Sequence, residues 1–168
     1  FLKAQGEVDD NPAEAVIHPK YQQNEPRILT RLEYRALRDV AKEDVRMAAI
    51  VELLLQTGMR ISELENLTIL DVDFDQNVIH ITAQNNQPAR EVPLNNAARK
   101  SLEKYLQVRP KTTRQDTFFL TKTCRPFLVR NIRSAIDRYF RIAGIKDAKV
   151  NDLRHTFIVE QLKAGTPL

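Results

Sequence analysis

Apolar residues recur at a helical spacing along most of the chain. Thr30 and Glu33 have the spacing of a capping box, and Leu32, Leu37 and Val40 form one apolar side behind them. Glycines follow two later segments with this period, because glycine readily takes the left-handed conformation that closes a helix. The predicted helices cover about 31–42, 43–56 before Gly58, 62–67, a stretch through 107 capped by Asn95 or Asn96, 128–143 before Gly144, and 151–164.

Between the third and fourth of these helices the period becomes two. Three short segments alternate apolar and polar residues, with turn-forming residues between them. They cover residues 70–75, 77–82 and 89–94. The segment 117–121, TFFLT, is a candidate for a further brief strand. The predicted fold is therefore α+β and mainly α, a helical domain with a small three-stranded antiparallel sheet.

Length and composition fit one domain with a short leading segment. The chain has 168 residues, 42% of them hydrophobic, which is enough for one core. Residues 9–27 contain three prolines and no sustained period, as is typical of a linker. The longest apolar stretch, Met47–Leu55, contains a glutamate and is far shorter than the roughly 20 residues of a membrane span, so we expect no membrane contact. The single cysteine, Cys124, cannot form an internal disulfide, and we expect a cytoplasmic protein.

Basic residues concentrate in the second half of the chain. Residues 1–98 contain 10 basic and 16 acidic residues, a balance of −6, whereas residues 99–168 contain 16 basic and 6 acidic residues, a balance of +10. Lysines and arginines that neutralise phosphates gain from the release of counterions. The second half is therefore expected to meet a polyanion, with a solvated basic surface as the alternative.

One arginine stands between two predicted helices. Arg60 follows the apolar run that ends at Gly58, and Glu63 is close enough in sequence to orient it. A surface ion pair would explain this motif if it stood alone. Arg154, however, opens the last helix in the basic half, in the stretch VNDLRHTF. Two guanidinium groups from separate segments are able to converge on one phosphate, each with a bidentate pair of hydrogen bonds.

These motifs resemble those of a known family. The stretches TGMRISELENLTILDVDFD, REVPL and DLRHTF, in this order, resemble the catalytic domain of the tyrosine recombinases, the phage integrase family. The similarity implies a catalytic domain in residues 27–168 with its C-terminal part missing, and a linker with the end of a preceding DNA-binding domain in residues 1–26. It also implies site-specific recombination or integration of double-stranded DNA on the nucleoid, with other recombinase protomers in a tetrameric synapse.

The resemblance implies a mechanism without a cofactor and without a metal. In this family a tyrosine attacks a phosphodiester and forms a 3′-phosphotyrosyl intermediate. Arg60 and Arg154 match the two family arginines that stabilise charge on the phosphate oxygens, and Glu63 would hold Arg60. Asn151 stands at the usual histidine position, where an amide donates a hydrogen bond but cannot shuttle a proton. His155 is common in the family's helix and is either structural or an assisting group.

The hairpin before the third strand departs from the family pattern. It reads TAQNNQPAR and lacks the family's catalytic lysine. Lys122 is a speculative substitute and a candidate DNA contact, with a solvated loop lysine as the alternative. Arg90, beside the hairpin, and the helix residues Arg130 and Arg133 are also expected to contact DNA.

The nucleophile is a second departure. All tyrosines of the chain precede Arg154 and lie in predicted linker or helical positions, so none matches the family's catalytic tyrosine. They are Tyr21, Tyr34, Tyr105 and Tyr139. The expectation is that this chain alone does not cleave DNA.

Three other interpretations compete with this one. The stretch LLLQTGMRISELENL has the outline of a helix-turn-helix, but its second helix would present Glu63 and Glu65 to the DNA. A metal-dependent hydrolase built on His18, His80 and His155 lacks close ligand spacing. A catalytically degenerate DNA-binding or regulatory protein on the recombinase fold stays open.

Overall fold

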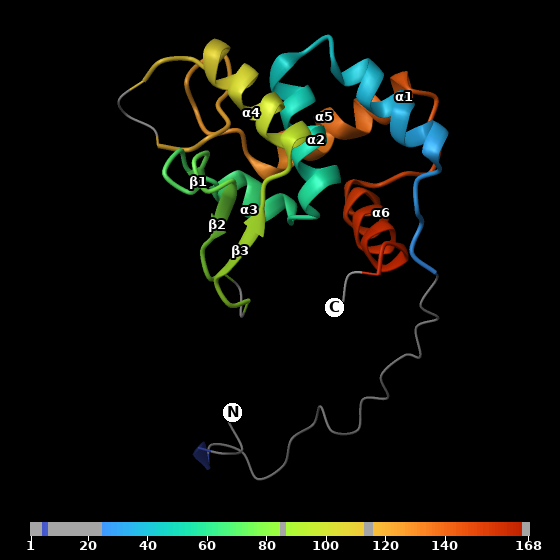
Figure 1. Cartoon of the computed structure of the whole chain (residues 1–168), viewed down its shortest axis with the longest axis horizontal. Helices are drawn as coiled ribbons and strands as arrows, with labels where there is room; N and C mark the ends of the chain where they lie inside the picture. Colours follow the sequence, from blue (N-terminus) through green and yellow to red (C-terminus); the bar gives the residue numbers. More distant parts are fainter. Residues whose placement is uncertain (1–4, 7–24, 85–86, 113–115, 166–168) are drawn as a thin grey trace.

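A computed structural model describes residues 5–6, 25–84, 87–112 and 116–165 (Figure 1). The helices are α1 (Arg31–Ala41), α2 (Val45–Thr57), α3 (Ile61–Asn66), α4 (Asn96–Val108), α5 (Val129–Ile142) and α6 (Val150–Lys163). The strands are β1 (Val72–Asp73), β2 (Val78–Ile81) and β3 (Arg90–Pro93). They form one antiparallel sheet in the order β1-β2-β3, which confirms the predicted fold class. No helix in these ranges is long and apolar enough to cross a membrane.

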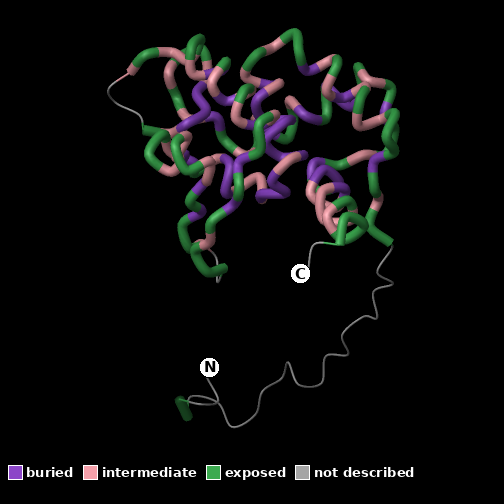
Figure 2. Tube along the Cα trace, in the orientation of Figure 1, coloured by how far each residue is buried: buried purple, intermediate pink, exposed green. Residues whose placement is uncertain are grey.

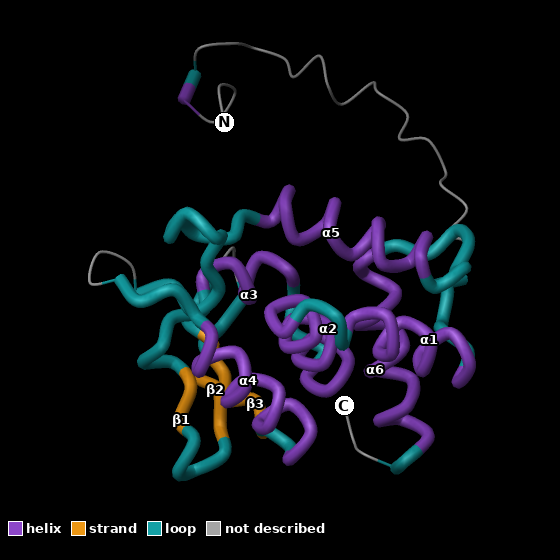
Figure 3. Tube along the Cα trace, turned by 90° about the horizontal axis from the view of Figure 1, so that it is seen from above, coloured by secondary structure: helices purple, strands orange, loops and turns teal. Residues whose placement is uncertain are grey.

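The central helix is α2. It lies between α5 on one side and α4 on the other in Figure 3, and α6 packs mainly on it. Nine of its 13 residues are buried, because its sequence is apolar around most of its circumference. Figure 2 shows the buried positions running through this centre, whereas residues 82–83 and 87–89 of the β2–β3 hairpin are exposed. The hairpin and α6 both extend from the same side of the helical body (Figure 1).

The start of α1 carries the predicted capping box. Thr30 Oγ1 accepts a hydrogen bond from the backbone N–H of Glu33 (3.2 Å), and Glu33 Oε2 accepts one from the backbone N–H of Thr30 (2.9 Å). The expectation that Leu32 joins the buried side is wrong, because this residue is 78% exposed. Leu37 and Ala41 form the buried face. Leu32 precedes Leu37 by five residues and so lies about 140° away from it around the helix.

The expected strand over 117–121 is a buried loop. Phe118, Phe119 and Leu120 are consecutive and all buried, whereas a strand with one exposed face alternates. The rings of Phe118 and Phe119 pack against Tyr105, with centroids 6.0 and 5.1 Å from its ring. The backbone N–H of Leu120 donates to the Tyr105 hydroxyl (3.0 Å) and so takes no part in a sheet ladder. The segment makes only isolated bridges because its side chains fill the core.

Gly58 ends α2 as predicted and also touches α6. Its φ of 59° lies in the left-handed region, and its N–H donates to the carbonyl of Leu54 (3.1 Å). A Cβ at this position would overlap the ring of Phe157 on α6. The Gly58 carbonyl accepts a hydrogen bond from Arg154 of the same helix. Glycine is therefore required both by the backbone conformation and by the close approach of α6.

Gly58→Ala is expected to lower the free energy of unfolding by roughly 2–4 kcal/mol, from left-handed strain plus overpacking against Phe157. Gly144→Ala is a matched control, since Gly144 has a φ of 70° and an added methyl group there would meet no described atom within 4 Å. Its cost should be only the strain, about 1–2 kcal/mol. Urea unfolding of both variants measures the difference, and equal losses would mean that the Phe157 contact contributes nothing.

Candidate functional site

Arg60 immediately precedes α3 and is held by Glu63 in the first turn of that helix. The backbone N–H of Arg60 donates to Glu63 Oε2 (2.7 Å), and its Nη1 donates to Glu63 Oε1 (3.1 Å). The ion pair predicted from the spacing is thus present. The other terminal nitrogen, Nη2, donates to Oε1 of Gln87 in the β2–β3 hairpin (3.1 Å). The guanidinium is therefore oriented from two sides.

Glu63 is shared by two arginines. It is 5% exposed, and Arg90 at the start of β3 binds it in a bidentate manner, with Nη1 and Nη2 each 2.8 Å from a carboxylate oxygen. Burial alone would raise the pKa of Glu63, but the hydrogen bonds from Arg90 and from the backbone of Arg60 outweigh it and lower the pKa to about 2. One carboxylate thus anchors two cations, and the cluster keeps an excess positive charge.

Arg154 reaches the same region from α6. Its Nη1 donates to the carbonyl of Gly58, which closes α2 two residues before Arg60. Burial lowers the pKa of Arg154, and the positive charge of Arg60 lowers it further. The carboxylate of Glu63 acts on Arg154 only at longer range and partly offsets this lowering, and no described salt bridge involves Arg154. A cation that is partly buried beside another cation favours an anion as its missing partner.

A pocket of about 300 Å³ lies between the start of α3 and the start of α6. Its polar lining consists of Arg60, Ser62, Asn151, Arg154 and His155, and apolar residues of α2, α3 and α6 complete the wall. None of the lining residues is acidic. Two guanidinium groups that are far apart along the chain but share one pocket form a site for an anion with several oxygens, such as a phosphate.

Asn151 and His155 line this pocket from α6, one on either side of Arg154 in the sequence. Asn151 is exposed, so its amide is accessible to a ligand. Nδ1 of His155 lies 3.5 Å from Oδ1 of Asp152 in the same helix, but it is buried and makes no hydrogen bond to any described residue. The other oxygen of Asp152 accepts the backbone N–H of Lys149 (2.7 Å) at the start of α6. Asp152 thus caps the start of α6 beside the ring of His155.

The other residues singled out from the sequence lie outside this pocket. Arg130 and Arg133 are exposed on α5, whose first backbone N–H, at Val129, donates to Glu65 of α3 (2.9 Å). Lys122 is exposed in a loop anchored at the opposite end of α2, where Arg46 Nη1 donates to the carbonyl of Leu120 (2.8 Å). The 13 residues of α2 separate its two ends by about 20 Å. Lys122 is not one of the residues that line the pocket.

Sequence reasoning missed two residues that position the arginines. Gln87 contacts Arg60 from the hairpin, and Gly58 holds Arg154 through its carbonyl. The hairpin residues Asn85 and Asn86 lie outside the described residues. The role of Gly58 was predictable in part. A glycine that closes a helix leaves its own carbonyl without a partner in that helix, so the carbonyl is free to accept a hydrogen bond from a side chain. No local pattern marks Gln87.

The tyrosines and histidines that the structure describes give no second site. Tyr105 and Tyr139 are buried and Tyr34 is half-buried, and none of the three lines the arginine pocket. Tyr21 and His18 lie outside the described residues. His80 on β2 is 3.5 Å from Glu91 of β3 and does not line the pocket that His155 lines. Within the described ranges no group of three histidine, cysteine or acidic residues is placed to hold a metal ion.

Comparison with known proteins decides the family. The sequence matches the phage integrase family over residues 22–168. The chain belongs to the phage integrase family. It is 31% identical over 175 residues to the tyrosine recombinase XerC of Staphylococcus carnosus, and the match covers 100% of this chain and 59% of the relative. The XerC of Roseiflexus castenholzii is also 31% identical, over 179 residues, with 100% of this chain and 57% of the relative covered.

Solved structures of this integrase family share the fold. The crystal structure of XerA recombinase superposes with a TM-score of 0.79 at 33% identity, over 88% of this chain and 53% of that chain. A lambda integrase dimer bound to a COC' core site gives a TM-score of 0.75 at 16% identity, over 97% of this chain and 62% of that chain, which shows the fold alone. The present chain spans a little over half the length of the curated relatives it matches.

Proposed function

We propose that this chain is the phosphate-binding part of the catalytic domain of a tyrosine recombinase, which cleaves and rejoins double-stranded DNA through a 3′-phosphotyrosyl intermediate. The observation that carries the proposal is the convergence of Arg60 and Arg154 on one pocket without acidic lining. The XerC relatives, named tyrosine recombinases, support the reaction class. The structural neighbours solved on DNA, such as XerH bound to difH, have the same fold.

The two arginines have one role in this chemistry. As the phosphorus becomes five-coordinate, negative charge builds on its nonbridging oxygens, and preoriented donors in a partly water-excluded pocket stabilise it. Glu63 keeps Arg60 in one orientation, and the Gly58 carbonyl does the same for Arg154. Asn151 would donate a further hydrogen bond to the phosphate. His155, which lies near Asp152 and lines the same pocket, would assist from the same side.

The proposal takes the attacking tyrosine from outside the described residues, since no described tyrosine lines the pocket. It assigns residues 27–168 to the catalytic domain and residues 1–26 to a linker and the end of a preceding DNA-binding domain. Other protomers would join it on DNA in a tetrameric synapse, in the cytoplasm on the nucleoid. Arg90, Lys122, Arg130 and Arg133 are proposed DNA contacts, with Arg90 acting mainly through Glu63.

A second candidate is a DNA-binding or regulatory protein that does not cleave. The hairpin favours it, because the sequence there offers no lysine as general acid and Gln87 takes a hydrogen bond from Arg60 instead. An amide cannot protonate the leaving 5′ oxygen. Cleavage of a suicide substrate by a full-length protein that contains this chain separates the two candidates.

Binding of this chain to a labelled DNA duplex is expected to weaken steeply with salt. Arg154→Ala should reduce the slope of log K against log[salt] by about 1, because one phosphate contact is lost. Arg31→Ala is the matched control: Arg31 is exposed on α1, outside the arginine pocket, and its slope should equal that of the unmodified chain. Binding that does not respond to salt would contradict a phosphate-dominated surface.

A further inference from the structure

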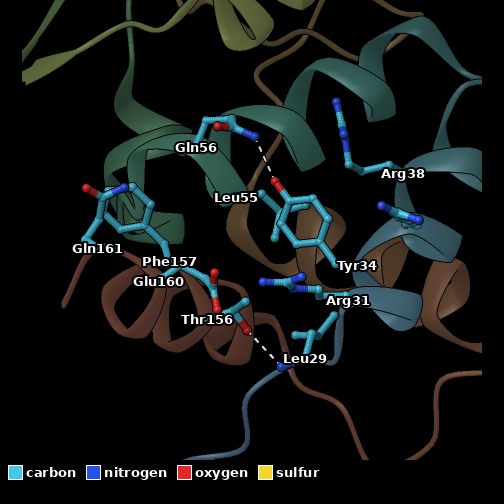
Figure 4. Close-up of a pocket in the computed structure, with 11 residues that line it drawn as sticks. Leu29, Arg31, Tyr34, Arg38, Leu55, Gln56, Thr156, Phe157, Glu160 and Gln161 are labelled. Carbon is cyan, nitrogen blue, oxygen red and sulfur yellow. Dashed lines mark hydrogen bonds between the residues drawn. The ribbon is translucent and has the colours of Figure 1, made fainter. Parts of the chain in front are cut away.

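Residues 27–30, the entering chain that leads into α1, are bonded directly to α6. The backbone N–H of Leu29 donates to Oγ1 of Thr156 (2.9 Å) across 127 positions of sequence (Figure 4). Leu29 is 5% and Thr156 is 2% exposed, so water does not compete for this bond. The Thr156 hydroxyl in turn donates to the carbonyl of Asp152 (2.6 Å). The hydroxyl therefore acts as donor and acceptor, and the buried N–H of Leu29 has its partner.

On the entering side, Leu29 is fixed to α1. The next residue, Thr30, caps α1 in the reciprocal capping box with Glu33. Two residues before Leu29, Arg27 pairs with Glu33 through Nη2 and Oε1 (2.6 Å). Residues 27–30 are thus bonded to the first turn of α1.

On the other side, Thr156 and Arg154 belong to the same helical turn. Two residues correspond to about 200° around a helix, so the two side chains leave α6 in nearly opposite directions. Arg154 bonds to Gly58, and Thr156 bonds to Leu29. The first half of α6 is therefore clamped from both sides, whereas its end is more exposed, with Leu162 at 45%.

Within the described residues, little else joins α1 to α6. Helix α1 packs mainly on α2 and less on α5. Between α1, the end of α2 and α6 lies a pocket of about 370 Å³, and the Leu29–Thr156 bond is on its wall (Figure 4). Leu29 and Leu153 of α6 belong to the same buried core, so packing already holds the entering chain near α6. The hydrogen bond adds a directional link between the backbone of Leu29 and Thr156.

We propose that Thr156 is a positioning residue that latches the entering chain to α6 and thereby sets the place of Arg154. Its consequence for DNA rests on the proposed function of Arg154, whereas its effect on the position of Arg154 does not. The matching variants are Thr156→Val, which keeps the shape and removes the hydroxyl, and Thr156→Ser, which keeps the hydroxyl.

The test measures amide exchange at Leu29 and the Arg154 side-chain resonance by NMR, together with the affinity of the chain for duplex DNA. In Thr156→Val the exchange protection of the Leu29 amide should fall about tenfold or more, as for the loss of one buried hydrogen bond. The side-chain Nε–H resonance of Arg154 should shift, and duplex affinity should fall. Thr156→Ser should keep the Leu29 protection, the Arg154 resonance and the duplex affinity close to those of the unmodified chain. Thr68→Val is the control: it removes a threonine hydroxyl that donates to Asp71 Oδ2 (2.7 Å), outside both residues 27–30 and the arginine pocket, and should destabilise the fold while leaving the Arg154 resonance in place.

The outcomes separate the latch from the function. Loss of Leu29 protection with an unmoved Arg154 resonance would overturn the proposal. A moved Arg154 resonance with unchanged duplex affinity would support the latch and contradict the proposed phosphate contact. If Thr156→Val does not fold, native-state exchange of the unmodified chain decides. The Leu29 amide and the Arg154 side chain should then become exposed in the same opening event, and independent opening would refute the latch.

Discussion

Arg60→Ala and Arg154→Ala, each made in a full-length protein that contains this chain, are expected to reduce DNA strand cleavage at least about 100-fold. The reason is that each guanidinium stabilises charge that develops only as the phosphodiester is attacked. Most of the duplex affinity should remain, because many other basic groups contribute to it. A suicide-substrate assay that traps the covalent protein–DNA product measures cleavage, and a binding titration measures affinity separately.

Two further variants sharpen this result. Arg154→Lys keeps the charge but loses the planar pair of donors, so it should also cleave poorly. Arg31→Ala removes a charge from α1 outside the pocket and should cleave like the unmodified protein. Cleavage by Arg60→Ala or Arg154→Ala at the unmodified rate would remove the basis for the assignment of the site.

Glu63→Gln is expected to remove on the order of 3 kcal/mol from the free energy of unfolding at pH 7. The pKa of Glu63 is about 2 in the folded chain against an ordinary value of 4.5. A lowered pKa stabilises the fold fully above the ordinary value, and the stabilisation is lost as the pH falls from about 4.5 towards 2. The variant should therefore lose this part of the acid dependence as well. Urea unfolding at pH 7 and pH 3 measures both effects.

Glu103→Gln is the control for this experiment. Glu103 accepts a hydrogen bond from Arg99 Nε at 2.9 Å, but its side chain is 44% exposed. An exposed pair contributes no more than about 1 kcal/mol, so its loss should be small. Similar losses in Glu63→Gln and Glu103→Gln would show that Glu63 does not anchor the two arginines as described.

Local sequence signals predicted most of the fold. The capping box at Thr30 and the glycine at the end of α2 act within one or two turns, so their spacing is visible in the sequence. The pairing of Arg60 with Glu63 is local in the same way. Leu32 was misplaced because a helical period read from few residues fixes the buried face only approximately.

Contacts between distant segments could not be predicted in this way. The bidentate bond from Arg90 to Glu63 joins β3 to α3, and the bond from Arg154 to Gly58 joins α6 to the end of α2. Both depend on how the elements pack, and no periodic pattern encodes that packing. The 117–121 segment is a similar case, since core packing of consecutive aromatic residues overrode its strand-like composition.

The central claim is that Arg60 and Arg154 bind the same phosphate. A crystal structure of this chain with duplex DNA tests it most directly, through the distances from both guanidinium groups to the phosphate oxygens. We expect both groups to lie within about 3 Å of nonbridging oxygens of one phosphate, with Glu63 still bonded to Arg60. Contacts of the two arginines with different phosphates, or of neither with DNA, would contradict the claim.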